Sequence, residues 1–469
     1  MSDNDSDSDD SSSTSHNDDH TFEITNLNED TAFFGELVED LMQRASSSSR
    51  AQPSSLEDRF IRQFKMDGFG SLREPPWGSS RNVDLFFHAL ALHPLSTIKL
   101  ENIGMFPYDT RSGTFPIRFL TRLLQSDTIC PSLTRLELRD VVLEGMNDEW
   151  FALMEALNAL PKLEVFSLET CDCTIDFPLE QFNHFNQLLQ QFMTRTRNAT
   201  SNTDGMDADT NGTSTTPPLR RLTLVPAQNY GGDLDPSTLT KLLGSNNSSL
   251  RELTLANVGR LNDTMMTTIF KTLSSRNNSN NDDDHKSTST NLELLDLKNC
   301  ELKASAVHAL SELLSCQHES LTTIKIGLTS LDQNRQRIHD QDDVYKNEAW
   351  TVELLTTLKS NRTVTKFVLS SETPRHLTPA ATDAYLQVMQ LNCSLRDMFI
   401  TYPNLHFHPN IMNFYAKLNQ LGRKRFLQEE HLATPLEWID MLARVSDDES
   451  CLFYFLRLNP LLCSQQQPT

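Results

Sequence analysis

One short apolar motif recurs along most of this chain and constrains its fold more than any other feature. A copy consists of a large apolar residue, two variable residues, a second apolar residue, one variable residue and a third apolar residue. Nine copies begin at Leu95, Leu133, Leu163, Leu219, Leu250, Leu292, Leu321, Val364 and Leu395. Four of the eight intervals between these starts are 29–31 residues long, and the others are longer. Such self-similarity predicts a repeat fold, in which each unit buries its apolar face against its neighbours.

Segments with helical periodicity lie between the motifs. Residues 149–160 and 305–314 place apolar side chains three and four positions apart, which predicts a helix with one buried stripe in each segment. The expected N-cap residues are Asn147 or Asp148 for the first of these helices, and Asn262 or Asp263 for a helix over 264–273. A repeat unit therefore contains one strand and one full helix.

Three polar stretches account for most of the longer intervals. Residues 196–217 and 277–290 are rich in Asn, Asp, Ser and Thr, and residues 329–347 are largely polar. Stretches of this composition do not build packed elements. We interpret all three as loops inserted into a basic unit of 29–31 residues.

The motif extends into a longer frame that resembles a known repeat family. The frame L-x-x-L-x-L-x-x-(N/C)-x-L is present as Leu292, Leu295, Leu297, Cys300 and Leu302, and again as Leu163, Phe166, Leu168, Cys171 and Cys173. With a full helix in each unit, residues 82–420 resemble the ribonuclease-inhibitor type of leucine-rich repeat. The resemblance implies an α/β fold: a right-handed, horseshoe-shaped solenoid of about nine repeats, with a concave parallel sheet and convex helices.

The chain around this repeat domain divides into further regions. We expect a disordered acidic tail at 1–20, a poorly ordered segment with short helices at most at 21–80, the repeat domain at 81–420, a helical cap at 421–463 and a tail at 464–469. Within the second region, residues 30–43 have the pattern of an amphipathic helix and residues 60–69 form a short apolar segment.

Amphipathic helices are expected to cap both ends of the array. Residues 82–92 precede the first motif, and residues 435–443 and 448–462 follow the last. The side chains expected to close the final repeat are Trp438, Ile439, Leu442, Phe453, Phe455 and Leu456. The segment Phe455–Pro460 is also similar to the tails of uncharacterised microalgal repeat proteins.

Composition excludes several classes of function. The net charge is −22 and the pI is near 5.0, which argues against binding a nucleic-acid backbone. Residues 1–30 contribute ten acidic side chains and no Lys or Arg; we interpret them as a solubilising tail, with a phosphorylatable regulatory tail as the alternative. Neither a leader peptide nor an apolar run of membrane-spanning length is visible. We expect a monomeric cytoplasmic protein with reduced cysteines, and a nuclear location stays open.

The sequence contains no signature of an enzyme, cofactor site or metal site. Cys171-Asp-Cys173 lacks a second ligand pair and fits the repeat frame, so we interpret both cysteines as structural. His406-Phe-His408 is interpreted as a surface loop rather than a ligand pair. The basic run Arg423-Lys-Arg425 suits a contact with a helix C-terminus better than a localisation signal.

The remaining candidate site is the concave face of the sheet. Strand alternation sends the motif residues into the core, so that the variable residues between them face outward. The candidate partner-binding residues are Lys99, Arg135, Glu137, Arg139, Glu169, Arg221, Glu252, Asp296, Lys298, Lys325, Lys366 and Phe399. Phe399 is the only aromatic residue among the variable positions of the nine copies, and mixed charges also serve simply to keep an exposed sheet soluble.

Three functions are compatible with this pattern. The first is a non-enzymatic scaffold that binds a protein partner through the concave face or the inserted loops. The second is a Ran-type GTPase-activating protein, a family that shares the repeat type, although no residue here aligns with its active loop. The third is a ubiquitin-ligase substrate receptor, for which residues 21–80 lack a convincing adaptor-binding box.

Overall fold

The structure is a computed structural model, and it describes residues 21–25, 31–47, 61–67, 80–103, 115–169, 172–173, 219–225, 236–244, 249–275, 291–300, 302–328, 341–371, 379–400, 409–427 and 433–459. The chain divides into two compact units, Met1–Arg260 and Leu261–Thr469. The predicted acidic tail and the first two predicted insertions lie outside the described residues.

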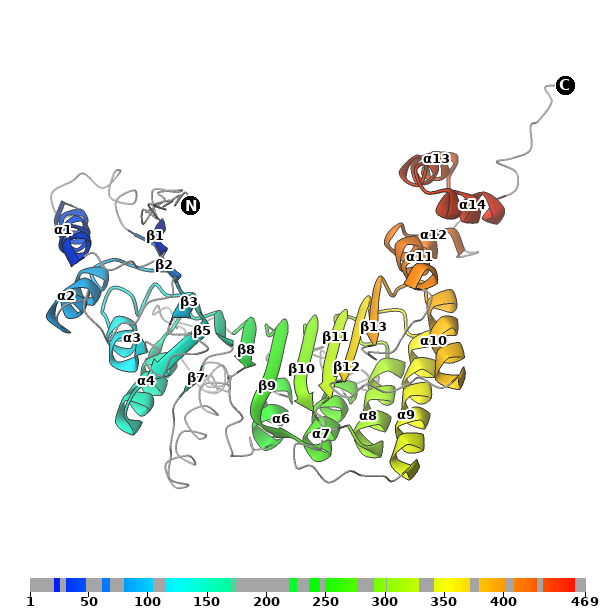
Figure 1. The fold of residues 1–469 in the computed structure, drawn as a ribbon, viewed down its shortest axis with the longest axis horizontal. Helices are drawn as coiled ribbons and strands as arrows, with labels where there is room; N and C mark the ends of the chain where they lie inside the picture. Colours follow the sequence, from blue (N-terminus) through cyan, green and yellow to red (C-terminus); the bar gives the residue numbers. More distant parts are fainter. Residues whose placement is uncertain are drawn as a thin grey trace, which may run out of the picture. The chain divides into compact units, whose positions relative to one another are not determined.

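Parallel strands form the sheet of the first unit (Figure 1). In order across the sheet they are β1 (Thr21–Thr25), β2 (Gln63–Asp67), β3 (Thr97–Ile103), β5 (Arg135–Glu144), β6 (Val165–Glu169), β8 (Arg221–Val225) and β9 (Glu252–Leu261). The short strands β4 (Phe115–Pro116) and β7 (Asp172–Cys173) pair with the C-terminal end of β5. Equivalent motif positions are aligned across the strands, so that Ile98, Leu136 and Phe166 are direct neighbours.

Helices cover one face of this sheet. They are α1 (Thr31–Ser47), α2 (Ser80–Leu90), α3 (Ile117–Leu124), α4 (Asn147–Ala159) and α6 (Pro236–Gly244). The helices α1 to α4 pack against one another in chain order, on the same side of the strands (Figure 1). None of the helices described in this unit lies on the opposite face of its sheet (Figure 1), and we call that face the open face.

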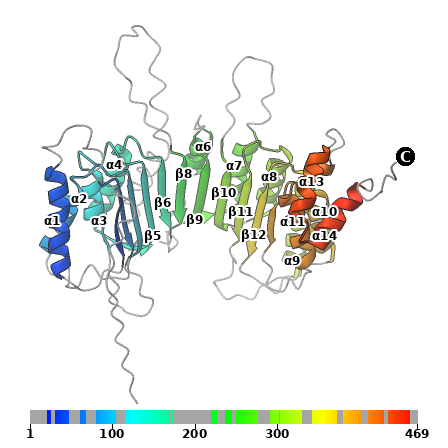
Figure 2. The ribbon, with the colours of Figure 1, turned by 90° about the horizontal axis from the view of Figure 1, so that it is seen from above.

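The second unit repeats the same strand and helix alternation (Figure 2). Its strands are β10 (Leu294–Cys300), β11 (Thr323–Leu328), β12 (Lys366–Ser371) and β13 (Asp397–Ile400), all parallel and adjacent in this order. Its helices are α7 (Asp263–Ser274), α8 (Ala304–Ser315), α9 (Gln341–Ser360), α10 (Pro379–Leu391), α11 (Pro409–Gln420), α12 (Arg423–Leu427), α13 (Pro435–Arg444) and α14 (Glu449–Leu458). Parallel strands that alternate with helices are compatible with a leucine-rich-repeat-like solenoid.

The apolar motif builds the core of both units. Every motif side chain that the structure describes is buried, except for Leu168, which is half-buried. Burial of one such side chain stabilises the fold by about 1.5–3 kcal/mol, so the repeated motif contributes substantially to the stability of both units. No helix among the described residues is long and apolar enough to cross a membrane.

The strands β1 and β2 were not predicted. The amphipathic helix expected over residues 30–43 is present as α1, which spans 17 residues, whereas no strand was expected in residues 21–80, and both strands extend the parallel sheet. A chain of aromatic contacts ties them to the core: the Phe22 and Phe64 rings lie 6.3 Å apart, and Phe64 lies 6.0 Å from Phe86. Ile61, Phe64 and Met66 have the spacing of the motif and are buried. Residues 61–66 therefore form a further copy of the strand motif.

Buried polar side chains connect successive helix–strand junctions. In the second unit, Asn361 donates to the carbonyl of Leu314 (2.6 Å), and Asn392 donates to the carbonyls of Leu358 (2.6 Å) and Asn361 (2.8 Å). In the first unit His93 is fully buried; its Nδ1 accepts from the Ile61 amide (3.3 Å). These residues satisfy backbone groups that would otherwise be buried without partners.

Two N-cap predictions have different outcomes. The side chain of Asn262 caps α7 by accepting from the Met265 amide at 3.0 Å, as predicted. The helix α4 instead begins one residue earlier than expected, with Met146 in the N-cap position, and the Glu149 carboxylate accepts from its amide at 2.9 Å. In addition, α9 begins at Gln341, within the third predicted insertion.

The C-terminal helices form their own cluster, but with a different buried face from the expected one. Trp438 and Phe455 are buried as predicted, together with Leu418, Met441, Val445 and Cys451. Ile439 and Phe453, by contrast, are 62% and 68% exposed. The predicted helices are present, but their orientation places these two side chains on the outer surface.

Candidate functional site: the open face of the sheet

The open face of the first unit carries in-register rows of polar side chains. A middle row runs from Glu23 through Lys65, Lys99 and Glu137 to Ser167 on five successive strands. The row at the strand beginnings includes Arg135, Val165, Arg221 and Glu252, and the row at the strand ends includes Asp67, Glu101, Arg139 and Glu169. The predicted site residues of this unit therefore share one surface.

Ion pairs neutralise much of this charge. Along single strands, Lys99 pairs with Glu101 at 2.8 Å and Arg135 with Glu137 at 2.9 Å. Between strands, the Arg221 guanidinium binds both carboxylate oxygens of Glu252. The Glu252 hydrogen bond, together with the charges of Glu252 and Glu137, raises the pKa of Arg221. A paired, mixed-charge surface of this kind adds little stability on its own.

The cations are generally the more exposed partners in these pairs. The Arg135 side chain is 43% exposed and that of Glu137 19%, and Lys99 is 32% exposed beside Glu101 at 19%. Arg139, 59% exposed, contacts Asp140, which is 28% exposed. Long Arg and Lys side chains extend further from the sheet than carboxylates do, so in these three pairs the cation is the more accessible partner.

Sequence reasoning missed the part of this surface that β1 and β2 contribute. Glu23, Lys65 and Asp67 occupy the same rows as the predicted residues. Lys65 lies directly opposite Lys99, which places two ammonium groups on neighbouring strands. The motif spacing of Ile61, Phe64 and Met66 would have revealed Lys65 and Asp67, whereas Glu23 carries no such signal because its strand lacks a leading apolar residue.

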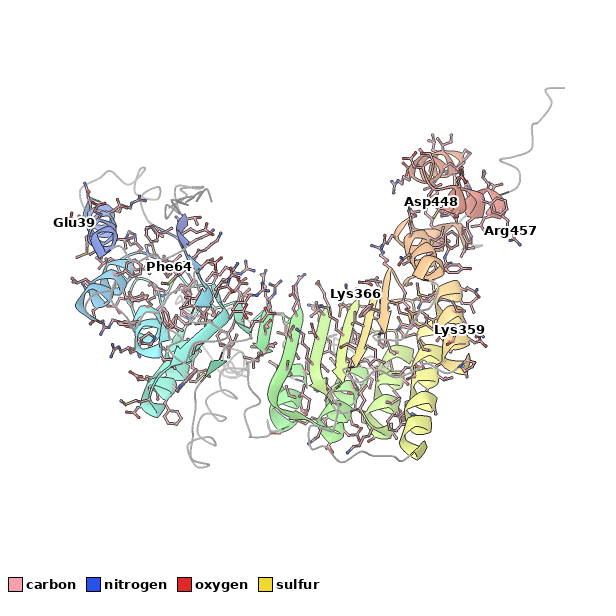
Figure 3. The ribbon with its side chains drawn as sticks, viewed as in Figure 1. Glu39, Phe64, Lys359, Lys366, Asp448 and Arg457 are labelled. Carbon is pink, nitrogen blue, oxygen red and sulfur yellow. The ribbon has the colours of Figure 1, made fainter. Side chains whose placement is uncertain are left out.

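The strands β10 to β13 of the second unit carry a separate set of predicted residues, on the face that corresponds to the open face of the first unit. Asp296 is buried and pairs with Lys325 at 3.2 Å, and Lys366 pairs with Asp397 on the adjacent strand. Lys366 lies on the strand side and Lys359 on the helix side (Figure 3). Phe399 is 54% exposed, and its neighbour in register is Val368. Lys298 is also exposed.

In the basic run Arg423-Lys-Arg425, both arginines make contacts within the fold. Arg423 is fully buried, and its guanidinium donates to the carbonyls of Met389 and Asn392 at the C-terminus of α10, at 3.0 and 3.1 Å. The same group lies over the Tyr415 ring. Arg425 pairs with Glu437. A contact between this run and a helix C-terminus was predicted, and Arg423 makes one.

The structure does not describe the side chains of the cysteine and histidine pairs that were considered as metal ligands. Cys171, His406 and His408 lie outside the described residues, and Cys173 is described only as part of a strand. Within the described ranges, no group of three or more His, Cys, Asp or Glu residues is arranged to hold a metal ion.

Comparison with known proteins adds little to these observations. No protein family matches the sequence, and no curated protein matches it. Among solved structures, the chain resembles "Leiomodin-1 Actin-Binding Site 2 (ABS2)" with 11% sequence identity and a TM-score of 0.31, over 42% of this chain and 98% of that chain. A likeness at this level supports no functional argument.

Proposed function

We propose that this chain is a non-enzymatic binding protein of the ribonuclease-inhibitor type of leucine-rich repeat, and that it holds a protein partner on its open face. The observation that supports the proposal is the alternation of buried and accessible side chains along each strand. Motif residues such as Leu136 and Leu138 are buried, whereas Arg135, Glu137 and Arg139 between them stay accessible. These accessible side chains are not needed for the core and remain available for recognition.

The chemistry of the face indicates what kind of partner it suits. Paired charges of both signs favour a polar protein surface with complementary charges, because such surfaces steer and orient a partner. Phe399 supplies an exposed aromatic side chain, which is the type of residue that anchors interfaces. The inserted loops, which were equal candidates in the sequence, lie largely outside the described residues.

Affinity capture from the native cell tests this proposal. The full-length chain is compared with the double variant Arg135→Glu/Arg139→Glu and with Arg122→Glu as a matched control. Arg122 is 52% exposed on α3 of the helix-covered side, where it pairs with Asp84. We expect partners that the wild type and the control retain and the double variant loses. Identical partner lists from all three proteins would overturn the assignment of the open face.

A further inference from the structure

We propose that the outer edge of β13, the side of this last strand that faces away from β12, binds an extended segment of a partner protein as one further parallel strand. The segment that fits carries a basic residue followed by three apolar residues. The inference goes beyond the proposed function, because the site is the edge of the sheet and not its open face. It rests on a backbone acceptor that a side chain occupies, and on the side chains beside it.

Successive strands of the second unit are joined by a repeated hydrogen bond. At the start of a strand, two consecutive amides donate to one carbonyl of the preceding strand, at 2.7–3.1 Å. Three successive steps make this contact, with the carbonyls of Glu293, Thr322 and Thr365 as acceptors. Arg396 holds the next position of this series, so its carbonyl has the place of the acceptor for a strand after β13.

A side chain takes that acceptor instead of a strand. Within the described ranges, β12 is the only strand that pairs with β13, which ends the sheet (Figure 1). The Arg396 carbonyl accepts from the exposed Gln420 Nε2 at 3.3 Å. A carboxamide N–H is chemically close to a peptide N–H, so Gln420 substitutes for a strand amide. The bond is long and exposed, and a peptide amide can therefore replace it.

The helix position of the same repeat is filled. The helix α11 packs beside α10, as earlier helices pack beside their predecessors. Asn419 at its end corresponds to Asn392, and donates to the carbonyls of Asn392 and Leu395. A complete repeat of a second copy therefore cannot stack here, because its helix would overlap α11. A single extended segment needs only the strand position.

The chain itself turns away from this strand position. The Asn392 side chain accepts the amides of Ser394 and Leu395, which lead into β13. The Oδ1 atom of Asn419 is buried and has no such partner in the part of the chain that the structure describes. The chain turns at Gly422, where φ is 86°, and continues as the short helix α12.

The backbone of β13 offers the groups that a parallel strand needs. The Asp397 amide donates to β12, and successive residues of a parallel strand direct their backbone groups to alternate sides. Met398 therefore directs its N–H and C=O to the outer edge. Its carbonyl accepts the Tyr385 hydroxyl at 3.1 Å, but a carbonyl has two lone pairs and can accept a second donor. Sheet edges of this kind bind extended peptides through main-chain hydrogen bonds.

The side chains of β13 indicate the chemistry of the segment. Asp397 is 49% exposed in spite of its ion pair, and Phe399 is 54% exposed. Cross-strand complementarity favours a basic residue opposite Asp397 and an apolar residue opposite Phe399. The residues opposite Met398 and Ile400 must be apolar because they point towards the core. Residues 366–369 of β12 have this pattern and pair with the same four residues from the other side.

Binding of a synthetic peptide tests the proposal. A fluorescein-labelled peptide with the sequence of residues 364–371 is titrated with the full-length chain, and fluorescence anisotropy is measured. We expect saturable binding at one peptide per chain. A control peptide is N-methylated at the positions of Thr365 and Lys366, the two amides that would donate to Arg396. It keeps every side chain, and we expect it to bind about tenfold more weakly.

Variants of the chain locate the site. Phe399→Ser should weaken binding several-fold, whereas Phe453→Ser, at a 68% exposed position on α14, should leave it unchanged. Gln420→Ala removes the competing amide and should tighten binding a few-fold. The matched control Gln387→Ala removes an exposed amide on α10 that contacts Lys359, and should have no effect.

Two results would overturn the proposal. One is equal affinity for the parent and the N-methylated peptide, and the other is no binding by either the wild type or Gln420→Ala. Arg135→Glu/Arg139→Glu, which alters the open face of the first unit, should bind the peptide as the wild type does. Failure of this proposal is therefore distinguishable from failure of the open-face assignment.

Discussion

At the scale of single residues, His93 makes the N-terminal repeats sensitive to acid. Nδ1 accepts the Ile61 amide, so Nε2 carries the proton and donates to the Leu41 carbonyl at 3.2 Å. Burial lowers the pKa of His93, and the nearby Arg44 lowers it further, while the Leu41 carbonyl and Asp40 act in the opposite direction. Protonation of Nδ1 would remove the acceptor for Ile61, so the native junction requires neutral imidazole.

The stability of the folded chain is expected to fall in acid because of His93. Because the pKa of His93 is lower in the folded than in the unfolded chain, acid favours unfolding. This stability is fully present above about pH 6.5 and is lost as the pH falls from there towards the folded-state pKa. We expect faster hydrogen exchange at β1 and β2 below that pH. His93→Asn should weaken the pH dependence, and His88→Asn, at an exposed position on α2, should preserve it. Equal pH dependence in both variants would contradict this role.

Gly145 is a second position at which a small change affects stability, because its surroundings leave little room for a Cβ atom. A Cβ at this position would lie 2.9 Å from both the Glu149 Oε2 and the Ile117 Cδ1 atoms. Glu149 Oε2 also accepts the Met146 amide at the start of α4, so it cannot move freely. We expect Gly145→Ala to lower the free energy of unfolding by about 1–3 kcal/mol, measured by urea unfolding. Adding Ile117→Val should cost less than the sum of the two single changes.

At the scale of elements, the asparagines between helix and strand lock one repeat to the next. Asn392 is fully buried; it donates to the Leu358 and Asn361 carbonyls and accepts from the Ser394 and Leu395 amides. Asn392→Ala would leave all four backbone groups without this partner, and each costs about 1–3 kcal/mol. We expect a loss of at least about 3 kcal/mol by urea unfolding. The control Gln420→Ala removes an exposed amide and should change stability by less than about 0.5 kcal/mol. Similar losses in both variants would contradict the locking role.

The elements also show how far sequence reasoning extends. The leucine motif is sufficient to locate β3, β5, β6 and β8 to β13, because the buried positions have a fixed spacing within each copy, whereas the short strands β4 and β7 carry no copy. It also predicts cross-strand neighbours such as Arg221 and Glu252, since parallel copies align motif to motif. The pairing of Arg135 with Glu137 on its own strand was not predictable, because it depends on the side-chain rotamers and not on the alignment of motif copies.

Other elements depend on information that a local pattern does not contain. In β1 the leading motif position is Asp19, so the strand has no apolar signal, and it is held by pairing with β2 instead. The exposure of Ile439 and Phe453 depends on how α13 and α14 rotate about Trp438 and Phe455 in the C-terminal cluster. Helical periodicity predicts that one stripe is buried, but several stripes of these apolar helices are equally suitable.

At the scale of the whole molecule, the stability of a repeat array is local. Each repeat contacts mainly its neighbours, so the free energy of the array is a sum over repeats and their interfaces. Phe64 is fully buried between Phe22 and Phe86 in the first unit. We expect Phe64→Ala, a change that typically costs about 3–5 kcal/mol in a core, to weaken mainly the repeats that surround it.

Hydrogen exchange read by mass spectrometry distinguishes local from global loss. In Phe64→Ala, peptides of β2 and β3 should exchange faster by several orders of magnitude, while peptides of β11 and β12 should keep the protection of the wild type. The reciprocal variant Phe367→Ala, at a fully buried position of β12, should show the opposite pattern. Equal loss of protection in all four strands after either change would mean that the array unfolds as one cooperative body. In that case a defect in one repeat would disorder all four strands at once, rather than only the strands nearest to it.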